Sequence, residues 1–427
     1  MTIAFTFILF LTFIVLTLPI AFSMELSTVA VMLANGQGSA LITILTKLFT
    51  GCNSTSMLAI PFFILAGSLM EEGGISDKIL EFANGMVGHL RGGLAMVAVL
   101  YSTLFSAVTG SAVAATTAVG ATMMPAMNKK GYDKPFTAAL IASAGTLGPI
   151  IPPSVSMIMI SSMTGESVAN LFLAGFVPGF MIAGFLMVIG WLYAKKNHIP
   201  KEPRQPAKEA AKAFGNAVWA LLSPVIIIGG ILSGLFTATE AGMISCVYSM
   251  IVGMFVYRGL TLKKLVGVFK KSVLGSAQIM FLVSMANVFA WILTRNSFGS
   301  ICAGLLKNIA HERVGFMLIM ILFFLFLGCF LEGAAMCTIF VPVLYPIGCV
   351  YGVGFPLMII MLMCVALGQI TPPVGVLLSV TSEMQGIKLT STFRYLPAVL
   401  GALLLAALLC GIFPQLITFL PRLLGTL

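Results

Sequence analysis

Two copies of a motif with paired prolines could create a binding site in this sequence. The copies are LGPIIPP, Leu147–Pro153, and LGQITPP, Leu367–Pro373, so Pro152 and Pro372 occupy equivalent positions. Each copy lies in a long apolar segment, and adjacent prolines interrupt an α-helix because they remove backbone donors. Unpaired backbone groups persist in a membrane only inside protein or beside a water-filled cavity. The repeated motif therefore predicts two broken membrane helices that form a binding site near the membrane midplane.

The two ends of a broken helix favour ligands of opposite charge. Free carbonyls at one end suit a small cation, and free amides at the other end suit a carboxylate. The small and hydroxyl residues of FSAVTGSAVAATTAVG, with basic residues on both flanks, predict a re-entrant hairpin with its tip near Thr109–Ser111. An ordinary span with a small-residue packing face is the alternative. A second tip is expected near Glu332-Gly333-Ala334.

The composition places these motifs in a membrane protein. Hydrophobic residues make up 59% of the 427 residues and charged residues 8%, whereas soluble domains carry about 25% charged residues. We therefore predict an all-α polytopic membrane protein with on the order of a dozen crossings or re-entrant pieces. The net charge is +10, but the basic residues cluster in short loops. This distribution is typical of the loop charges that set the orientation of a membrane protein and does not indicate nucleic-acid binding.

The spans that carry these motifs divide into two halves. We expect two inverted-topology repeats, because counting spans from a basic, cytoplasmic linker gives the two hairpins opposite orientations. The loop Arg295–Arg313, with three basic residues on the predicted outside, disagrees with this count. The predicted units are a first repeat at 1–194 (hairpin about 92–127, broken helix about 135–166), the linker at 195–212, and a second repeat at 213–427 (hairpin about 314–347, broken helix about 356–383).

Two further segments carry predictions about the spans. The apolar run Ile3–Phe22 lacks a basic residue before it and is expected to be one membrane helix rather than a signal peptide. Lysines alternate with leucines and valines in Arg258–Lys271, which predicts an amphipathic helix on the inner membrane surface. A separate span, Ser272–Leu293, should follow it.

Two carboxylates have several possible roles. Glu332 lies among apolar residues of the second tip, where it could balance a cation, carry a proton, or only bond backbone amides. Glu240, within GLFTATEAG, is expected to have a structural role such as capping a helix. The acids are too few and scattered for an intramembrane enzyme. The eight cysteines form no CxxC pair and have no histidine at ligand spacing, so no metal cluster is predicted. A channel remains a weaker alternative because half-breaks in both repeats favour alternating access.

An ordered set of strings resembles a known family. AIPFFILAGSLM, PAMNKKGYDKPFTAAL followed by GPIIPPS, GLFTATEAG and GQITPPVG, from about Ala59 to Gly375, are similar to the large membrane subunit of tripartite ATP-independent periplasmic (TRAP) transporters. The resemblance implies an ion-transporter-superfamily fold with an elevator-type scaffold and a mobile transport domain. It also implies sodium-coupled import of an organic acid, such as a C4-dicarboxylate or sialic acid, across a bacterial inner membrane. A periplasmic substrate-binding protein and a small membrane subunit, expected to be a separate chain, are the implied partners, and no organic cofactor is expected.

Within this fold, each hairpin tip is expected to face the broken helix of its own half. Each pair would form a sodium site, giving two or more sites, with the acid bound between them. The candidate sodium ligands are Ser106, Thr109, Gly110, Ser111, Gly145, Thr146, Gly148, Pro152, Glu332, Gly333, Ala334, Gly368, Thr371 and Pro372. The candidate substrate-binding residues are Thr109, Ser111, Pro153, Ser154, Gly333, Ala334 and Pro373. Proton coupling through Glu332 is the alternative to sodium coupling.

Overall fold

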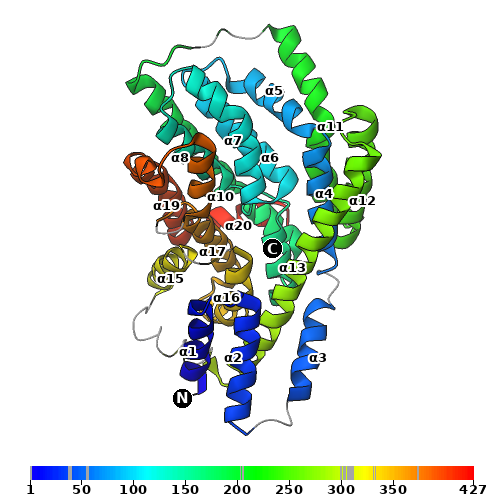
Figure 1. Ribbon diagram of the computed structural model, residues 1–427, viewed down its shortest axis with the longest axis vertical. Coiled ribbons are helices and arrows are strands. Elements are labelled where there is room, and N and C mark those ends of the chain that lie inside the picture. Colours follow the sequence, from blue (N-terminus) through cyan, green and yellow to red (C-terminus); the bar gives the residue numbers. More distant parts are fainter. Residues whose placement is uncertain are drawn as a thin grey trace.

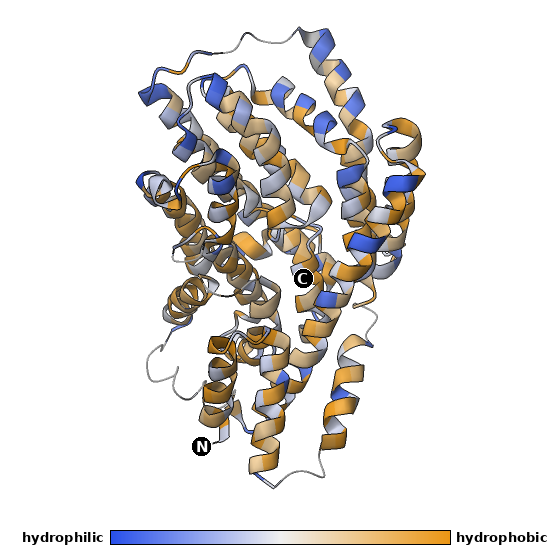
Figure 2. Ribbon diagram, in the orientation of Figure 1, coloured by the Kyte–Doolittle hydropathy of each residue, from blue (hydrophilic) through white to orange (hydrophobic). Residues whose placement is uncertain are grey.

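The computed structural model is an elongated bundle of helices. It describes residues 2–36, 41–53, 57–201, 203, 206–298, 301, 304, 312–329, 331, 333–372 and 375–427, and within these residues every regular element is a helix. Glu332 and Pro373 of the predicted site lie outside the described residues. Hydrophilic residues gather at the upper end of the molecule, around the end of α10 (Val168–Lys196) and the start of α11 (Ala207–Leu232) (Figures 1 and 2).

Several helices in the described part of the chain are long and apolar enough to cross a membrane. The chain is therefore a multi-pass, all-helical membrane protein, as the composition predicts. These helices are α10 (Val168–Lys196), most of α11 (Ala207–Leu232), α12 (Ala238–Ile251) with the π-helix Val252–Val256, α13 (Leu262–Arg295) and α16 (Gly333–Val350). A sixth candidate is α19 (Leu396–Ile412) with α20 (Gln415–Leu423), a pair bent by 68°.

The prediction of one span at Ile3–Phe22 was wrong. The run forms two helices, α1 (Thr2–Val15) and α2 (Ile20–Ala34), which pack against each other. Pro19 occupies the N-cap of α2, and Thr17 has a φ of 65°. A proline lacks the N–H that a continuous helix needs and disfavours helical geometry in the preceding residue. The chain therefore turns back after Val15.

The separate amphipathic helix at Arg258–Lys271 was also a wrong prediction. Thr261 caps a single helix, α13, through a bond from the Lys264 amide to its hydroxyl (3.3 Å), and this helix continues to Arg295. No proline interrupts its 34 residues, which extend about 51 Å. This length exceeds the roughly 30 Å hydrocarbon core, so the lysine-rich first turns are the part of α13 that extends beyond it.

The motif regions form two sets of helices with short interruptions. In the first half, α6 and α7 pack side by side around a two-residue turn, and the proline pair lies between α8 and α9. In the second half, α15 and α16 precede α17 and α18, which flank the other proline motif. The bounds are α6 Gly93–Thr109, α7 Ala112–Lys129, α8 Lys134–Gly145, α9 Val155–Thr164, α15 Arg313–Gly328, α17 Gly354–Gly368 and α18 Val376–Gln385.

The two sets pack crosswise at the centre of the molecule. Helix α9 lies against α16, and α18 lies against α7 and α8, so the second part of each interrupted helix contacts helices from the other half. In Figure 1, α16 and α17 lie in the middle of the bundle, where α17 also contacts α10 and α20. This crossing brings the turn between α6 and α7, the end of α15, the start of α16 and both proline motifs toward one central region.

A second group of helices forms one wall of that region. Helix α4 (Ala59–Glu72) packs against α12 and α13 and also contacts α6 and α9. Helices α3 (Leu41–Cys52) and α2 also pack on α13, and α5 (Ile75–Val87) packs on α11. After α18 the chain passes through a 3₁₀ helix, Leu389–Arg394, into α19.

The structural role predicted for Glu240 is confirmed. Its carboxylate accepts a bond of 2.7 Å from the Thr237 amide, and the Thr237 hydroxyl accepts one of 3.3 Å from the Glu240 amide. This reciprocal capping box satisfies two donors at the start of α12. Glu240 therefore acts locally, away from the central region.

Candidate functional site

A central cavity of about 570 Å³ lies where the two sets of helices meet the wall of α4 and α13. This volume falls within the range typical of small-molecule sites, roughly 300–1,000 Å³. The cavity is lined by residues of the turn between α6 and α7, of the end of α15 and the start of α16, of both proline motifs, and of α4 and α13. The sequence segments that carry the repeated motif thus converge on one space rather than on the perimeter.

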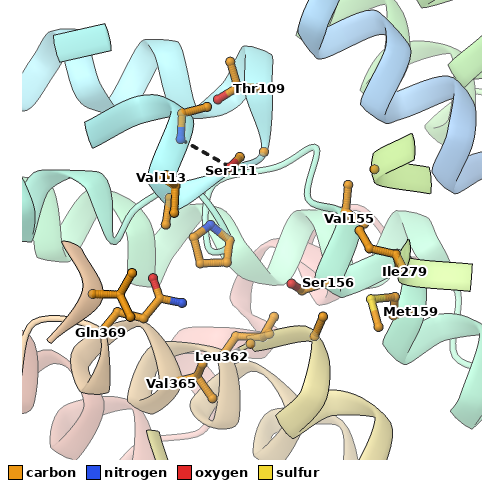
Figure 3. A pocket seen from close by; sticks show the side chains of 18 of the residues that line it. Thr109, Ser111, Val113, Val155, Ser156, Met159, Ile279, Leu362, Val365 and Gln369 are labelled. Carbon is orange, nitrogen blue, oxygen red and sulfur yellow. Dashed lines mark hydrogen bonds between the residues drawn. The ribbon is translucent and has the colours of Figure 1, made fainter. Parts of the chain in front are cut away.

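Four helix N-termini from the two motif regions line this cavity with residues of their first turns. Its lining includes Ala112–Ala114 of α7, Val155 and Ser156 of α9, Gly333 and Ala334 of α16, and Val376 of α18. The first amides of a helix have no partner within the helix and carry the positive end of its dipole. In Figure 3 the starts of α7 and α9 and the side chain of Gln369 face one another across the cavity. The cavity therefore offers an environment that stabilises negative charge.

The first turn is packed directly on the first proline motif. A Cβ added to Gly110 would lie 2.7 Å from the Pro153 carbonyl oxygen and 3.4 Å from the Ser154 Cα. A Cβ added to Gly148 would lie 2.5 Å from the Ala112 nitrogen. Glycine is required on both sides because the two backbones approach too closely for a side chain. The turn and the interruption are therefore in direct backbone contact.

The second half shows the same kind of contact. A Cβ on Gly368, the last residue of α17, would overlap the backbone of Gly328, the last residue of α15. A Cβ on Gly333 would lie 3.5 Å from Cγ1 of Val365 and 4.0 Å from Nε2 of Gln369. The ends of α15 and α17 and the start of α16 therefore lie within contact distance of one another.

The predicted site residues divide into three groups in the structure. Those that line the cavity are Thr109, Gly110, Ser111, Gly333, Ala334 and Gly368. Those buried within the first half, around the turn and the proline motif, are Ser106, Gly145, Thr146, Gly148, Pro152, Pro153 and Ser154. Thr371 and Pro372 are half-buried and do not line the cavity. The two remaining candidates, Glu332 and Pro373, are the ones outside the described residues.

Buried hydroxyl oxygens without a partner gather near the first turn. Within the described residues, Ser106 Oγ, Thr116 Oγ1 and Ser154 Oγ are buried and make no hydrogen bond. Thr116 approaches Gly145 so closely that a Cβ there would overlap its hydroxyl. An unpaired buried oxygen is costly unless an unseen ligand or ion satisfies it. These three oxygens are therefore available as ligands.

Three predicted hydroxyl ligands of the first half, those of Thr109, Thr146 and Ser111, already have partners. Thr109 Oγ1 donates to the Phe105 carbonyl at 3.1 Å, and Thr146 Oγ1 donates to the Ser143 carbonyl at 2.6 Å. The Ser111 hydroxyl caps α7 by accepting a bond of 3.4 Å from the Ala114 amide, shown dashed in Figure 3. By contrast Ser154, at the N-cap of α9, makes no capping bond. The first amides of α9 therefore lack the side-chain cap that the first amides of α7 have.

Residue-type reasoning missed several polar groups of the cavity. Gln369 lines it, and its buried Oε1 makes no hydrogen bond among the described residues. It occupies the same place in LGQITPP as Pro149 does in LGPIIPP, and both residues line the cavity. The difference between the two motif copies was the signal that could have identified it. Glu71 and Lys271, which also line the cavity, had no such local signal.

Comparison with known proteins identifies similar sequences over nearly the whole chain. Residues 7–416 match the family described as the tripartite ATP-independent periplasmic transporter, DctM component. A C4-dicarboxylate TRAP transporter large permease protein from Pseudomonas aeruginosa is 38% identical, over 89% of each chain. A sialic acid TRAP transporter large permease protein from Vibrio cholerae is 33% identical, over 95% of each. The YdaH transporter of Alcanivorax borkumensis resembles the fold, with a TM-score of 0.60 at 15% identity over 88% of this chain and 89% of that one.

Proposed function

Because this chain belongs to the DctM-component family of tripartite ATP-independent periplasmic transporters, we propose that it carries an organic acid across the bacterial inner membrane. The relatives are named as permease subunits, so the chain is a transporter component and not an enzyme. A periplasmic substrate-binding protein would deliver the acid, and a small membrane subunit would complete the complex. These two partners correspond to the tripartite composition in the family's name.

The convergence of four helix N-termini on one cavity is the observation that carries this proposal. Free amides and helix dipoles stabilise a carboxylate without an arginine or lysine at the same place. The apolar and glycine-rich remainder of the lining leaves room for a small carbon skeleton. The relatives' names make a C4-dicarboxylate or sialic acid the first acids to test.

We further propose that sodium drives this transport. The buried oxygens of Ser106, Thr116 and Ser154 lack partners, and the carbonyl ends of α6 and α8 lie at the same turn and motif. Oxygen ligands of this kind suit a small hard cation. When bound, the ion would supply positive charge that links the first turn to its proline motif. In the second half, the ends of α15 and α17 would provide carbonyls for another ion.

The arrangement also supports an elevator movement with two inverted repeats. The crosswise contacts of α9 with α16 and of α18 with α7 and α8 support treating the two motif regions as one body. At the first turn, the wall of α4 and α13 meets this body through glycine: a Cβ on Gly67 would lie 3.3 Å from Cα of Thr109. A contact made of backbone and small residues has no interlocking side chains to resist sliding. We propose that the body moves against this wall.

Sodium dependence is the decisive test of the proposed function. The chain, a small subunit and a binding protein are reconstituted in liposomes, and uptake of the two candidate acids is measured. Replacing external sodium by choline at constant pH should reduce the uptake of the transported acid to background. Unchanged uptake would exclude sodium coupling and favour the proton-coupled alternative through Glu332, which a proton gradient would then drive. A large single-channel current would instead identify a pore.

The unpartnered serine near the first turn gives a residue-level prediction. Ser106→Ala removes one candidate ligand and should raise the sodium concentration for half-maximal uptake by about tenfold, which corresponds to one hydrogen bond or ligand of about 1.4 kcal/mol. The matched control is Ser143→Ala, because Ser143 is equally buried but its hydroxyl already donates to the Ala139 carbonyl at 2.8 Å. Equal sodium dependence in the two variants would remove Ser106 from the site.

A further inference from the structure

The cavity has one charged corner. Glu71, at the end of α4, and Lys271, in α13, both line it, and Lys271 Nζ donates to Glu71 Oε2 at 3.2 Å. Among the described residues that line the cavity, these two are the charged ones. They are 200 positions apart in the sequence, so the fold and not a local motif places them together. At such an ion pair, a carboxylate of an anionic cargo can replace Glu71 as the partner of Lys271.

The ion pair is close to the first turn. Glu71 and Gly67 are one helical turn apart on the same face of α4, and Gly67 approaches Thr109 of the turn. Four residues correspond to a rise of about 6 Å along the helix. A small acid bound at the helix N-termini is therefore about long enough to reach the ion pair.

The pair also marks one end of the cavity. Lys271, Gly275 and Ile279 line it at intervals of four residues along one face of α13, so Lys271 is the lining residue nearest the lysine-rich start of that helix. The end of α4 that carries Glu71 leads into α5, which lies at the hydrophilic upper end of the molecule (Figures 1 and 2). Basic loops favour the cytoplasmic side. The pair therefore belongs to the cytoplasmic end of the cavity.

The bond between the two side chains is easily exchanged. The Lys271 side chain is 61% exposed and that of Glu71 28% exposed. Ion pairs in such surroundings contribute about 0–1 kcal/mol, because water screens the charges and ordering two long side chains costs entropy. A carboxylate on the cargo would offer the Lys271 ammonium an equivalent partner. Opening the pair is therefore no obstacle to binding an acid there.

Building on the proposed function, we propose that Lys271 is a specificity-determining residue that holds a cargo carboxylate at the cytoplasmic end of the cavity, and that Glu71 displaces this carboxylate as the cargo leaves. Lys271 then pairs with the cargo carboxylate in the loaded state and with Glu71 in the empty state. Without Glu71, the lysine retains the acid and slows its release. Without Lys271, the uncompensated carboxylate of Glu71 repels the acid at this end of the cavity.

The test measures how cargo inside the liposomes inhibits uptake. Binding protein is added only outside, so the internal acid, either a C4-dicarboxylate or sialic acid, reaches the cytoplasmic side of the active complexes. Glu71→Gln should lower the internal concentration that halves uptake about fivefold, and Lys271→Gln should raise it about fivefold, as expected for one partly screened ion pair. Lys270→Gln is the control, because Lys270 is exposed on the same helix and does not line the cavity.

The possible failures are distinguishable. If the wild-type complex carries no acid at all, the proposed function fails. If the wild type carries an acid and both variants match Lys270→Gln, the exchange at Lys271 is disproved and the proposed function stands. An equal fall in maximal rate in both variants, with a lower unfolding temperature and an unchanged half-inhibiting concentration, would identify a purely structural ion pair and would also overturn the inference.

Discussion

Gly110→Ala is expected to abolish uptake, with a loss of at least about 100-fold. The new Cβ would lie 2.7 Å from the Pro153 carbonyl oxygen, so the turn must move away from the proline motif by roughly half an ångström or more. Displacements of about 1 Å at a positioned site commonly reduce activity by about 100-fold. The uptake assay in liposomes measures this loss directly.

A control substitution at a second glycine separates the effect of this contact on uptake from the effect of backbone strain. Gly110 has a φ of +61° and Gly131 a φ of +85°, so alanine is strained at both and costs about 1–2 kcal/mol in either place. The nearest atom to a Cβ at Gly131 is 3.9 Å away, in the Ile199 side chain. Gly131→Ala should therefore lower the unfolding temperature through strain alone, by less than Gly110→Ala does, while uptake persists. If both variants lose uptake equally, the loss reflects strain and not the contact with Pro153.

The location of the breaks could be predicted because its cause is local. Paired prolines stop a helix wherever they occur, and the structure ends α8 at Gly145 and α17 at Gly368, a few residues before each pair. At the N-terminus, the expectation of one span follows from the length of the apolar run, although Pro19 lies within that run and breaks it. At α13, the predicted boundary at Lys271 rests on a change in composition, but no residue there stops a helix and α13 continues.

The charged and amide groups of the cavity could not be predicted in the same way. Gln369 lines the cavity because of how the helices pack. The signal for it in the sequence is that the equivalent residue of the other motif copy is Pro149. Glu71 and Lys271 each looked like an ordinary charge at the end of a hydrophobic segment. Their pairing depends on how α4 packs on α13, and such a tertiary contact has no local pattern. The sequence therefore indicated the backbone of the site better than its side chains.

In the second half, Gly368→Ala is expected to stop transport without straining the backbone. Gly368 is helical, and alanine by itself favours a helix by about 1 kcal/mol. Its Cβ, however, would overlap the backbone of Gly328, and the reciprocal Cβ on Gly328 would lie 3.1 Å from the Cys364 carbonyl oxygen. Neither backbone can rotate away as a side chain can. The ends of α15 and α17 must separate, and Gln369 moves with them.

The effect should appear in transport and be absent from a control glycine. Gly401→Ala places a methyl group in α19 with nothing within 4 Å, so uptake should stay near the wild-type level and the unfolding temperature should not fall. For Gly368→Ala we expect uptake to fall by about 100-fold. Sodium should still raise its unfolding temperature, because the first turn and its buried oxygens are unchanged and an ion that binds only the folded state stabilises it. Full transport by Gly368→Ala would contradict a role for the second half in holding the acid, and the cavity would then depend on the first turn alone.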